Sequence, residues 1–380
     1  PAAGNLVVRC DSSTALNPGD RAVVRGKIYP FTARHGGYGR LMTRRGYVGT
    51  LYLNRSSLLL SDTLHRELSP KHLSLFLHER AVARLDRLAL APDEQALCNA
   101  MTAGDRRSLS PALRAAYSRS GTSHLLAVSG LHVGIVFLLA NLLLWWLPLF
   151  RHGHILRNIA VILLIWLYAA TTGFPPSVVR AALMFSVLQF ALASSSEYVG
   201  MNTLAGVAFV MLLFHPDYLF DISFQLSFIA VAGIIAWGLP LCRLLRTRRK
   251  SIDMLTATLA IGFSASAATA PLISHTFGQI SVVGLALNPV VILLSYVVVG
   301  SCTLWLVIPG TALAPLFSVV AGFAARAQNE LIRAAAALPA AALDIRLTTT
   351  QCWIVYGLFI FATLLLWSAE RKKSVSSLPE

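Results

Sequence analysis

Charged residues are scarce in this sequence, and acidic residues are the scarcer kind. Only 13% of the 380 residues are charged, with 32 Lys and Arg against 17 Asp and Glu, whereas a soluble domain carries roughly 25% charge. Hydrophobic residues make up 56% of the chain, and the mean hydropathy is +0.64. This composition excludes an ordinary soluble protein and indicates a chain that is largely embedded in lipid.

The signatures of metal, redox and nucleotide chemistry are also missing. The cysteines show no CxxC or metal-ligand spacing (Cys10, Cys98, Cys242, Cys302 and Cys352). Cys10 and Cys98 are a candidate disulfide only if both face an oxidising compartment. His152 and His154 lie in a basic loop and offer too few ligands for a metal. No Walker-type GxxxxGK[ST] loop is present, so we expect no cofactor, no metal and no motor within this chain.

The start of the chain carries no targeting signal. It begins at Pro1 without a Met, and Pro1–Leu6 is too short and too polar for a signal peptide. We therefore interpret the sequence as a fragment whose upstream anchor is missing.

Residues 1–70 predict a small β-rich soluble domain. Leu6–Cys10, Arg21–Tyr29 and Tyr47–Leu53 have the pattern of short strands, and Asn17–Asp20 is a turn signal. Short strands with Gly-rich turns fit a small barrel such as an OB-fold, whose open face often holds nucleic acid.

Basic residues are concentrated in this first part of the chain. The formal net charge is +15, and +9 of it lies in the first 120 residues. A cluster of arginines lies among aromatic residues (Arg34, Arg40, Arg44 and Arg45 with Tyr38 and Tyr47). Such a cluster suits an anionic partner, either nucleic acid or lipid headgroups. Surface salt bridges and a solvated basic face explain it equally well, so charge alone leaves both interpretations open.

Residues 71–120 predict an amphipathic helical connector. Apolar residues recur at roughly helical spacing from Leu73 to Leu88, with arginines between them. Pro92 and Pro111 divide the segment. A helix of this kind is expected to lie on a membrane surface.

From residue 121 to 370 the chain predicts a polytopic membrane domain, because a spanning helix needs about 20 apolar residues. The candidate spans are 124–149, 155–173, 177–194, 200–215, 222–242, 254–273, 280–308, 311–338 and 351–368. The eighth is the least secure, since Arg326, Glu330 and Arg333 fall on one face. They form either an internal ion-pair stripe or the charged side of a surface amphipathic helix. The fold class is therefore mainly α, with eight to nine spans, an N-terminal OB-like barrel and a basic tail at 371–380.

The positive residues indicate an orientation. Lys and Arg clusters follow the first, fifth and ninth candidate spans, near Arg151, Arg243 and Arg371, so all three fall on one side. The positive-inside rule makes that side cytoplasmic. The N-terminal domain is then outside the cytoplasmic membrane, and the C-terminus is in the cytoplasm.

Polar residues interrupt the apolar runs at four places, and polar groups are costly inside a bilayer. The first place is Gly121–Gly134, where Gly130 and Gly134 have the spacing that lets two helices approach closely. Ser129 and His132 can lie on one helix face and suggest a hydrolase pair, but no acidic residue lies near in sequence to orient them. Hydrogen bonding between helices or a wet lining is the preferred interpretation.

The other three places combine helix starts with unusual polar residues. The second place is Thr171–Arg180, where Pro175 and Pro176 suit the start of a helix. Arg180 is either an interfacial side chain that snorkels to headgroups or a fixed cation facing a polar cavity. In the third, His215–Ser227, Asp221 is expected to cap the following helix, and Gln225 needs a hydrogen-bonding partner. Asn288–Pro289 is either a pore-lining hinge or a simple kink.

Several of these segments carry ordered motifs. They are Gly37–Tyr47, Gly121–His132, Thr172–Ala181, Asp221–Phe228, and Ala270–Pro271 with Asn288–Pro289. They resemble motifs of the ComEC family. In the same order, these motifs are the Gly-rich link of the OB-like domain, the HLLA-SGLH signature, the TG…SVVRA segment, the FQLSF segment and the later intramembrane pattern. That family comprises the membrane channel proteins of bacterial natural competence, and the resemblance spans most of the chain.

The resemblance implies a plasma-membrane protein that passes single-stranded DNA inward during transformation, with an external OB-like domain that meets DNA. Many family members also carry a C-terminal metallo-β-lactamase-like domain, but nothing resembling its HxHxDH motif is present here. We therefore expect no enzyme activity and no catalytic residue in this chain. The implied partners are single-stranded DNA, the lipid bilayer, a DNA receptor, a cytoplasmic motor and a separate nuclease.

A strand that carries one charge per phosphate needs a wet path lined by cations and hydrogen-bond donors. The candidate DNA-binding and pore residues are Arg40, Arg44, Arg45, His124, Ser129, His132, Arg180, Asp221, Gln225 and Asn288. Their convergence on one path is a hypothesis.

The leading functional hypothesis is a channel for uptake of single-stranded DNA. A small-molecule or lipid transporter would also use broken helices and intramembrane polar residues, but it does not explain the basic external domain. An intramembrane hydrolase would use Ser129 and His132.

Overall fold

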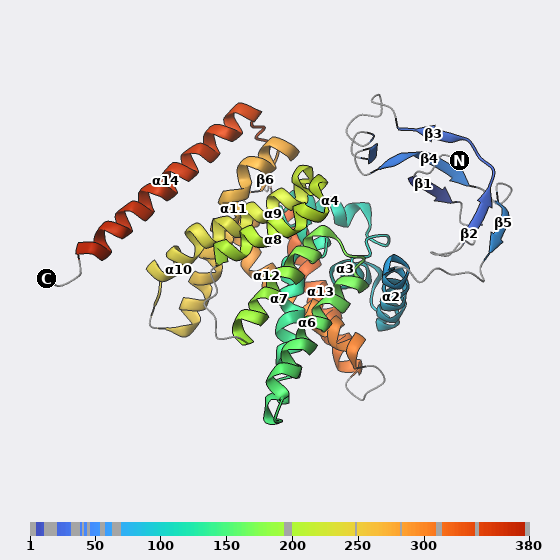
Figure 1. Ribbon diagram of the computed structural model, residues 1–380, viewed down its shortest axis with the longest axis horizontal. Coiled ribbons are helices and arrows are strands. Elements are labelled where there is room, and N and C mark those ends of the chain that lie inside the picture. The colour runs from blue at the N-terminus through green and yellow to red at the C-terminus, as the bar shows by residue number, and fades with distance from the viewer. Residues whose placement is uncertain are drawn as a thin grey trace.

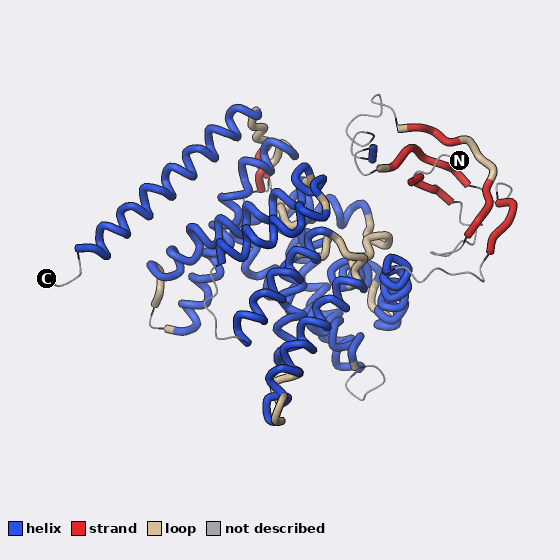
Figure 2. The backbone as a smooth tube through the Cα atoms, viewed as in Figure 1, coloured by secondary structure: helices blue, strands red, loops and turns tan. Residues whose placement is uncertain are grey.

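A computed structural model describes residues 5–10, 21–31, 39, 42–43, 46–53, 58–62, 70–193, 200–247, 249–281, 283–308, 314–338 and 342–376. Most of these residues are helical, and Figures 1 and 2 show the N-terminal strands separate from the helices that follow. The arginine cluster and the predicted turn lie outside the described residues (Arg34, Arg40, Arg44, Arg45 and Asn17–Asp20).

The N-terminal strands form two small sheets. The first has the order β1 (Asn5–Cys10), β4 (Tyr47–Leu53), β3 (Ile28–Pro30), with β1 parallel and β3 antiparallel to β4. In the second, β2 (Arg21–Val24) pairs antiparallel with β5 (Leu58–Asp62). The predicted strands are confirmed, except that Arg21–Tyr29 is divided because its two halves join different sheets. β5 was not predicted.

Side chains near the end of the central strand β4 alternate between buried and exposed. Leu51 and Leu53 are buried, whereas Tyr52 between them is exposed, as the alternation of side chains along a strand requires. Gly49 lies opposite Pro30, and a Cβ atom at this glycine would stand 2.5 Å from the carbonyl oxygen of Tyr29. Glycine therefore lets β3 approach β4 closely.

Three helices form the connector: α2 (Pro70–Leu85), α3 (Pro92–Thr102) and α4 (Pro111–Arg119). Pro92 and Pro111 are the first residues of their helices, where a missing N–H costs no intrahelical bond. The predicted position on a membrane surface is wrong for α3, because residues Ala96 to Thr102 are all buried within the protein. They pack against α12 and α13 in one apolar cluster.

The remaining described helices carry the apolar runs. They are α5 (Gly130–Leu143), α6 (Gly153–Thr171), α7 (Pro176–Ala193), α8 (Gly200–Phe214), α9 (Ile222–Gly233), α10 (Leu239–Leu244), α11 (Lys250–Phe277), α12 (Val283–Val307), α13 (Ala314–Ala336) and α14 (Thr349–Ser376). The short strand β6 (Ile280–Ser281), which follows α11, pairs antiparallel with β7 (Ala342–Leu343), which precedes α14. A π turn joins α9 to α10, so the two continue as one rod.

Five helices within the described ranges are long and apolar enough to cross a membrane. They are Gly130–Leu149, Gly153–Thr171, Ile222–Leu244, Ile252–Phe277 and Leu287–Val307. Three shorter apolar helices accompany them (Pro176–Ala191, Gly200–Phe214 and Thr349–Leu364).

Two predicted features of these helices differ from the structure. The first span does not begin at residue 124, because Ser123–Leu126 forms a 3-10 turn and helix α5 starts only at Gly130. Asn288–Pro289 does not break its helix, since α12 continues through Pro289. The backbone therefore shows no break at Asn288–Pro289, and the pore-lining interpretation of Asn288 stays a prediction.

The exposed face of helix α13 is apolar in its first half and charged in its second half. Leu316, Val319 and Phe323 are exposed and apolar, whereas Arg326, Glu330 and Arg333 are exposed and charged on the following turns. Arg333 donates to Glu330 at 2.8 Å and also pairs with Asp93 of the connector. The predicted internal ion-pair stripe is wrong, because all three residues are exposed; Arg333 pairs with Glu330 and with Asp93, which lies outside α13.

Cys98 is a free thiol and is fully buried in α3. A hydrogen bond with Cys302 of α12 and burial raise the pKa of the Cys98 thiol well above its ordinary value. The candidate pairing of Cys98 with Cys10 is therefore not present in this structure.

Candidate functional site

The histidine in the first turn of α5 forms a hydrogen bond with the residue that caps this helix. His132 is fully buried, and its Nδ1 accepts the backbone N–H of Ser129 at 3.0 Å. This bond assigns the proton of the neutral ring to Nε2. Because the bonded nitrogen is directed at the backbone, the ring is not arranged as a base for the Ser129 hydroxyl.

Two glycines bring α5 against α7. A Cβ atom on Gly130 would lie 3.6 Å from the Cβ of Ala181, and one on Gly134 would lie 3.2 Å from the ring of Phe185. The predicted close approach at these glycines is confirmed. The first turn of α7 is fixed to the same place, since Ser177 donates its hydroxyl to the carbonyl oxygen of Val128 at 2.9 Å.

Arg180, one turn into α7, is buried rather than directed to a surface. Only 3% of the residue is exposed, and its guanidinium carbon lies 5.3 Å from the centroid of the Phe228 ring on α9. Asp221 lies close enough to attract it electrostatically. A snorkelling side chain would extend away from the protein, so Arg180 is instead a fixed cation between α7 and α9.

Asp221 caps α9, as predicted. Its carboxylate accepts the backbone N–H groups of Ser223 at 2.8 Å and Phe224 at 3.4 Å. Gln225, one turn on, donates to the carbonyl oxygen of Leu219 at 2.8 Å. Both side chains therefore hold the turn before α9 in place, and the Asp221 charge stands beside Arg180.

The two remaining predicted residues lie on other elements. His124 is in the 3-10 turn before α5, where its ring bonds the backbone of Gly121. Asn288 belongs to α12, and its neighbour Leu287 packs in the apolar cluster. The structure thus brings together the predicted residues of α5, α7 and α9 through contacts between these helices, with His124 in the turn that precedes α5.

Three of the predicted residues share one property. His132 Nε2, Arg180 Nη1 and Asn288 Oδ1 are buried polar atoms without a hydrogen-bond partner among the described residues, whereas Ser129 and His132 together form the capping box of α5. Leaving such an atom unpaired in an apolar interior costs about 1–3 kcal/mol. Water or a polar ligand at these atoms would remove that cost.

The sequence interpretation missed other polar residues of the apolar helices. Gln189 of α7 donates to Asn158 of α6 at 2.6 Å, and Arg157 donates to Asn141 of α5 at 2.9 Å. Asn141 also donates to Gln189 at 3.4 Å, so the far ends of α5, α6 and α7 are joined. Isolated amides within apolar runs were the signal that could have identified this group.

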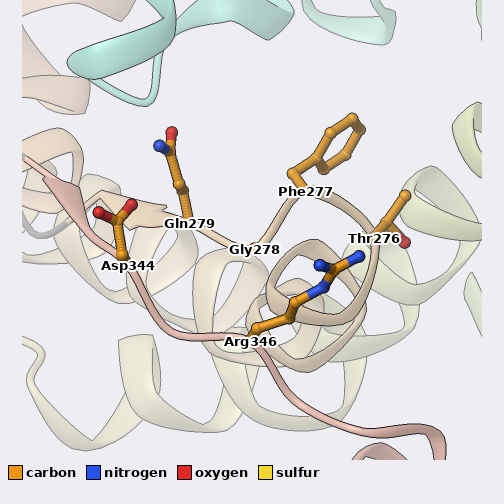
Figure 3. Close-up of a pocket in the computed structure, with 6 residues that line it drawn as sticks. All are labelled: Thr276, Phe277, Gly278, Gln279, Asp344 and Arg346. Atoms are coloured by element: carbon orange, nitrogen blue, oxygen red, sulfur yellow. The ribbon is translucent and has the colours of Figure 1, made fainter.

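A pocket of 410 Å³ lies apart from the predicted residues, between the end of α11 and the segment before α14 (Figure 3). Its lining residues are Thr276, Phe277, Gly278, Gln279, Asp344 and Arg346. The pocket holds one acidic and one basic side chain, so it has no strong preference for a ligand of either charge.

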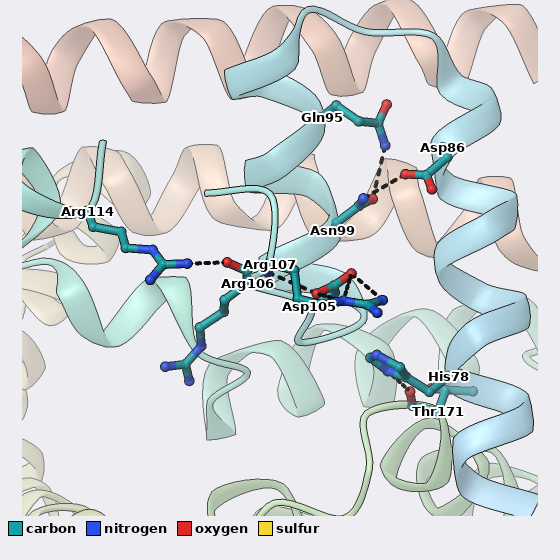
Figure 4. A network of polar contacts seen from close by, with 9 residues as sticks. All are labelled: His78, Asp86, Gln95, Asn99, Asp105, Arg106, Arg107, Arg114 and Thr171. Atoms are coloured by element: carbon teal, nitrogen blue, oxygen red, sulfur yellow. Dashed lines mark hydrogen bonds and ion pairs between the residues drawn. The ribbon is translucent and has the colours of Figure 1, made fainter. Parts of the chain in front are cut away.

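The connector is attached directly to the helix ends around the candidate site. Ser74 donates to the carbonyl oxygen of Ala170 at 2.7 Å. Figure 4 shows the neighbouring bond of His78 with the carbonyl oxygen of Thr171, at 3.0 Å. Gly104 has a φ of 83°, and a Cβ atom there would stand 3.2 Å from the side chain of Val128. The connector therefore lies against both segments that precede α5 and α7.

A second part of the network in Figure 4 stabilises the connector itself. Asn99 accepts from Gln95 at 3.0 Å and donates to Asp86 at 2.8 Å. Arg107 forms an ion pair with Asp105 at 2.9 Å. This guanidinium holds the pKa of the Asp105 carboxyl below its ordinary value.

The surface of the helical part defines the class of protein. Large apolar side chains are exposed all along the described helices, for example Leu142 and Leu149 at the end of the first span and Phe361 on α14. Trp145 and Trp146 are exposed near the end of the first span, and tryptophan is enriched at membrane–water interfaces. Exposed apolar surface of this extent marks contact with lipid, and the chain is a multi-pass helical membrane protein.

The chain belongs to the competence protein family, whose profile matches residues 101–372. It is 33% identical over 204 residues to ComE operon protein 3 of Bacillus subtilis, an alignment that covers 52% of this chain and 24% of the relative. It is 29% identical over 201 residues to an uncharacterized protein of Aquifex aeolicus, covering 52% of this chain and 45% of that protein. The chain thus spans less than half the length of either relative, and no solved structure matches it.

Proposed function

We propose that this chain forms a membrane channel through which single-stranded DNA crosses the cytoplasmic membrane during natural transformation. The observation that carries the proposal is that His132, Arg180 and Asn288, all on apolar helices, each have a buried polar atom without a hydrogen-bond partner among the described residues. A strand of phosphates needs cations and donors in its path, bound weakly enough that the strand keeps moving. Membership of the competence protein family supports the same conclusion.

The proposal includes a finer architecture. The five long apolar helices, the three shorter ones and α13 together make eight to nine crossings. The strands of residues 1–70 belong to an OB-like barrel outside the membrane. The basic segments near Arg151, Arg243 and Arg371 face the cytoplasm by the positive-inside rule. Single-stranded DNA, a DNA receptor, a cytoplasmic motor and a separate nuclease are the proposed partners.

We further propose that the chain has no catalytic function of its own. The bond between His132 Nδ1 and the backbone N–H of Ser129 supports this, because a hydrolase would direct that ring at the hydroxyl. A serine-reactive probe should therefore leave Ser129 unlabelled in active protein. Labelling of Ser129 would favour the hydrolase.

Replacing Arg180 by methionine tests the channel. A cation about 4 Å from a phosphate gains about 4 kcal/mol at an effective dielectric constant of 20, and each 1.4 kcal/mol is about tenfold in binding. We expect internalised DNA to fall at least about tenfold, while DNA bound at the cell surface is unchanged. Arg326→Met removes an exposed arginine of α13 and is the matched control, for which normal uptake is expected.

The assay measures surface-bound and internalised DNA separately in a strain that carries only the variant chain. Normal internalisation with Arg180→Met would remove Arg180 from the path. Normal internalisation in a strain that lacks the protein would refute the channel and favour the small-molecule or lipid transporter.

A further inference from the structure

Polar side chains join three apolar helices at the ends away from the connector. Arg157 of α6 donates from Nη2 to Asn141 Oδ1 of α5 at 2.9 Å, and Asn141 donates to Gln189 Oε1 of α7 at 3.4 Å. Gln189 in turn donates to Asn158 Oδ1 of α6 at 2.6 Å. Gln189 is buried, and the other three residues are partly buried. We call these four residues the Arg157 cluster.

Arg157 is the charged member of the cluster, and it has no acidic partner. Its guanidinium offers several N–H donors, but its one hydrogen bond among the described residues goes to the neutral Asn141. Its Nε atom is buried without a partner, and no ion pair within the described part of the chain includes it.

The helices around Arg157 cannot provide the missing counter-charge. The sequence contains no Asp or Glu from Arg106 to Ser196, a stretch that includes all of α5, α6 and α7. An arginine keeps its charge under all ordinary conditions, and a cation held in a membrane protein without a counter-ion is costly. An anion from outside these helices would therefore stabilise the cluster.

The position of the cluster along α6 corresponds to a boundary of the bilayer. Ser74 and His78 of the connector bond the last turn of α6, at Ala170 and Thr171, whereas Arg157 is in its second turn. From Arg157 to Ala170 an α-helix rises about 20 Å, at about 1.5 Å per residue. Arg157 is therefore near the other end of a helix that is just long enough to span, where lipid headgroups begin.

Exposed apolar side chains surround the cluster. Each of its three amide residues is followed in the sequence by a large exposed apolar residue, namely Leu142, Ile159 and Phe190. The turn between α5 and α6 adds exposed tryptophans, Trp145 and Trp146, and a second exposed cation, Arg151. A ligand that matches this surface combines an anionic head with apolar chains.

We propose that the Arg157 cluster binds the phosphate of an anionic phospholipid, whose acyl chains lie on the exposed apolar side chains of α5, α6 and α7. Basic sites between spanning helices suit anionic headgroups. Nucleic acid and soluble phosphate carry the same charge but bring no acyl chains. A zwitterionic lipid carries its own cation, which Arg151 repels. The inference goes beyond the proposed channel and requires only that these helices cross a membrane.

Titration of the purified full chain in detergent micelles with phosphatidylglycerol or phosphatidylcholine, followed by native mass spectrometry, measures the affinity for each lipid. We expect phosphatidylglycerol to bind more tightly. Arg157→Gln removes a charge-assisted hydrogen bond and should weaken phosphatidylglycerol binding at least about tenfold, with phosphatidylcholine binding unchanged. Arg243→Gln removes an exposed arginine of α10 and is the matched control, for which unchanged binding of both lipids is expected.

A second measurement needs no variant and so holds even if Arg157→Gln does not fold. A phosphatidylglycerol analogue with a photoreactive diazirine in its headgroup should label wild-type peptides that contain residues 141–159. An excess of unmodified phosphatidylglycerol should prevent this labelling, whereas phosphatidylcholine should not.

Equal affinity for the two lipids would overturn the proposal, as would unchanged phosphatidylglycerol binding in a folded Arg157→Gln variant. Labelling confined to peptides outside α5, α6 and α7 would also overturn it. Displacement of the lipid by glycerol 3-phosphate would show a site for soluble phosphate, and displacement by an oligothymidylate would show a site for nucleic acid. Either displacement would refute the phospholipid site.

Discussion

Replacing Tyr117 by phenylalanine tests whether the connector is joined to α13 by hydrogen bonds in addition to apolar packing. The buried phenol donates to Asn329 Oδ1 at 3.0 Å and accepts from Gln328 Nε2 at 3.3 Å. Burial raises the pKa of Tyr117 well above its ordinary value, so the phenol keeps the proton that it donates. Asn329 also donates to the carbonyl oxygen of Asp93 at 3.1 Å, which extends the network into α3.

The change to phenylalanine removes both hydrogen bonds and leaves Asn329 Oδ1 buried without its donor. A hydrogen bond contributes about 1 kcal/mol, and a buried polar atom left unpaired costs about 1–3 kcal/mol. We therefore expect the free energy of unfolding to fall by about 2–3 kcal/mol. Tyr29→Phe is the matched control, because half of that residue is exposed, and its effect should stay within about 0.5 kcal/mol.

Unfolding by sodium dodecyl sulfate in mixed micelles, followed by tryptophan fluorescence, measures this difference. A double-mutant cycle with Asn329→Leu isolates the contact, since the two residues should show a coupling energy above about 0.5 kcal/mol. A Tyr117→Phe variant as stable as the wild type, with no coupling to Asn329, would refute the reasoning.

Two further predictions concern the candidate site and the connector. Gly134→Leu should destabilise the protein by about 1–3 kcal/mol through overpacking against Phe185, whereas Gly262→Leu, with open space around it, should be neutral or stabilising by the same assay. Asp105→Asn should cost about 1 kcal/mol at neutral pH because it breaks the ion pair with Arg107. Since the folded pKa of Asp105 is lowered, the wild-type advantage should be present above about pH 4, the value for an unfolded aspartate, and be lost as the pH falls through the lower folded pKa. Stability measured against pH would contradict this if the advantage persisted in acid.

Local sequence signals predicted the structure wherever one physical cause acts within a few residues. Pro92 and Pro111 start helices because they lack an N–H that the first turn does not use. Asp221 caps α9 because its carboxylate reaches amides two and three residues on. Gly130 and Gly134 predicted a close helix contact, although the sequence did not identify α7 as the partner.

Features that depend on distant partners were not accessible from the sequence. Tyr117 and Asn329 are 212 residues apart, and neither stands out from its own helical pattern. The choice between the two interpretations of Arg180 required the position of Phe228 on another helix. The contact between Tyr29 and Tyr52 was not predicted because the two rings come from β3 and β4, and only the strand register brings them together.

The joined ends of α5, α6 and α7 have a mechanical consequence. Glycine contacts fasten α5 to α7 near one end, and the bonds of Asn141 and Gln189 fasten all three helices near the other. Helices α5, α6 and α7, which are joined at both ends, should move as one rigid body. We therefore expect any change in the spacing of the helices to occur at the interface between α7 and α9, the seam. Arg180 over Phe228 is a contact across that seam, and a desolvated pair of this kind holds about 2 kcal/mol. Separating α7 from α9 would therefore require this contact to break.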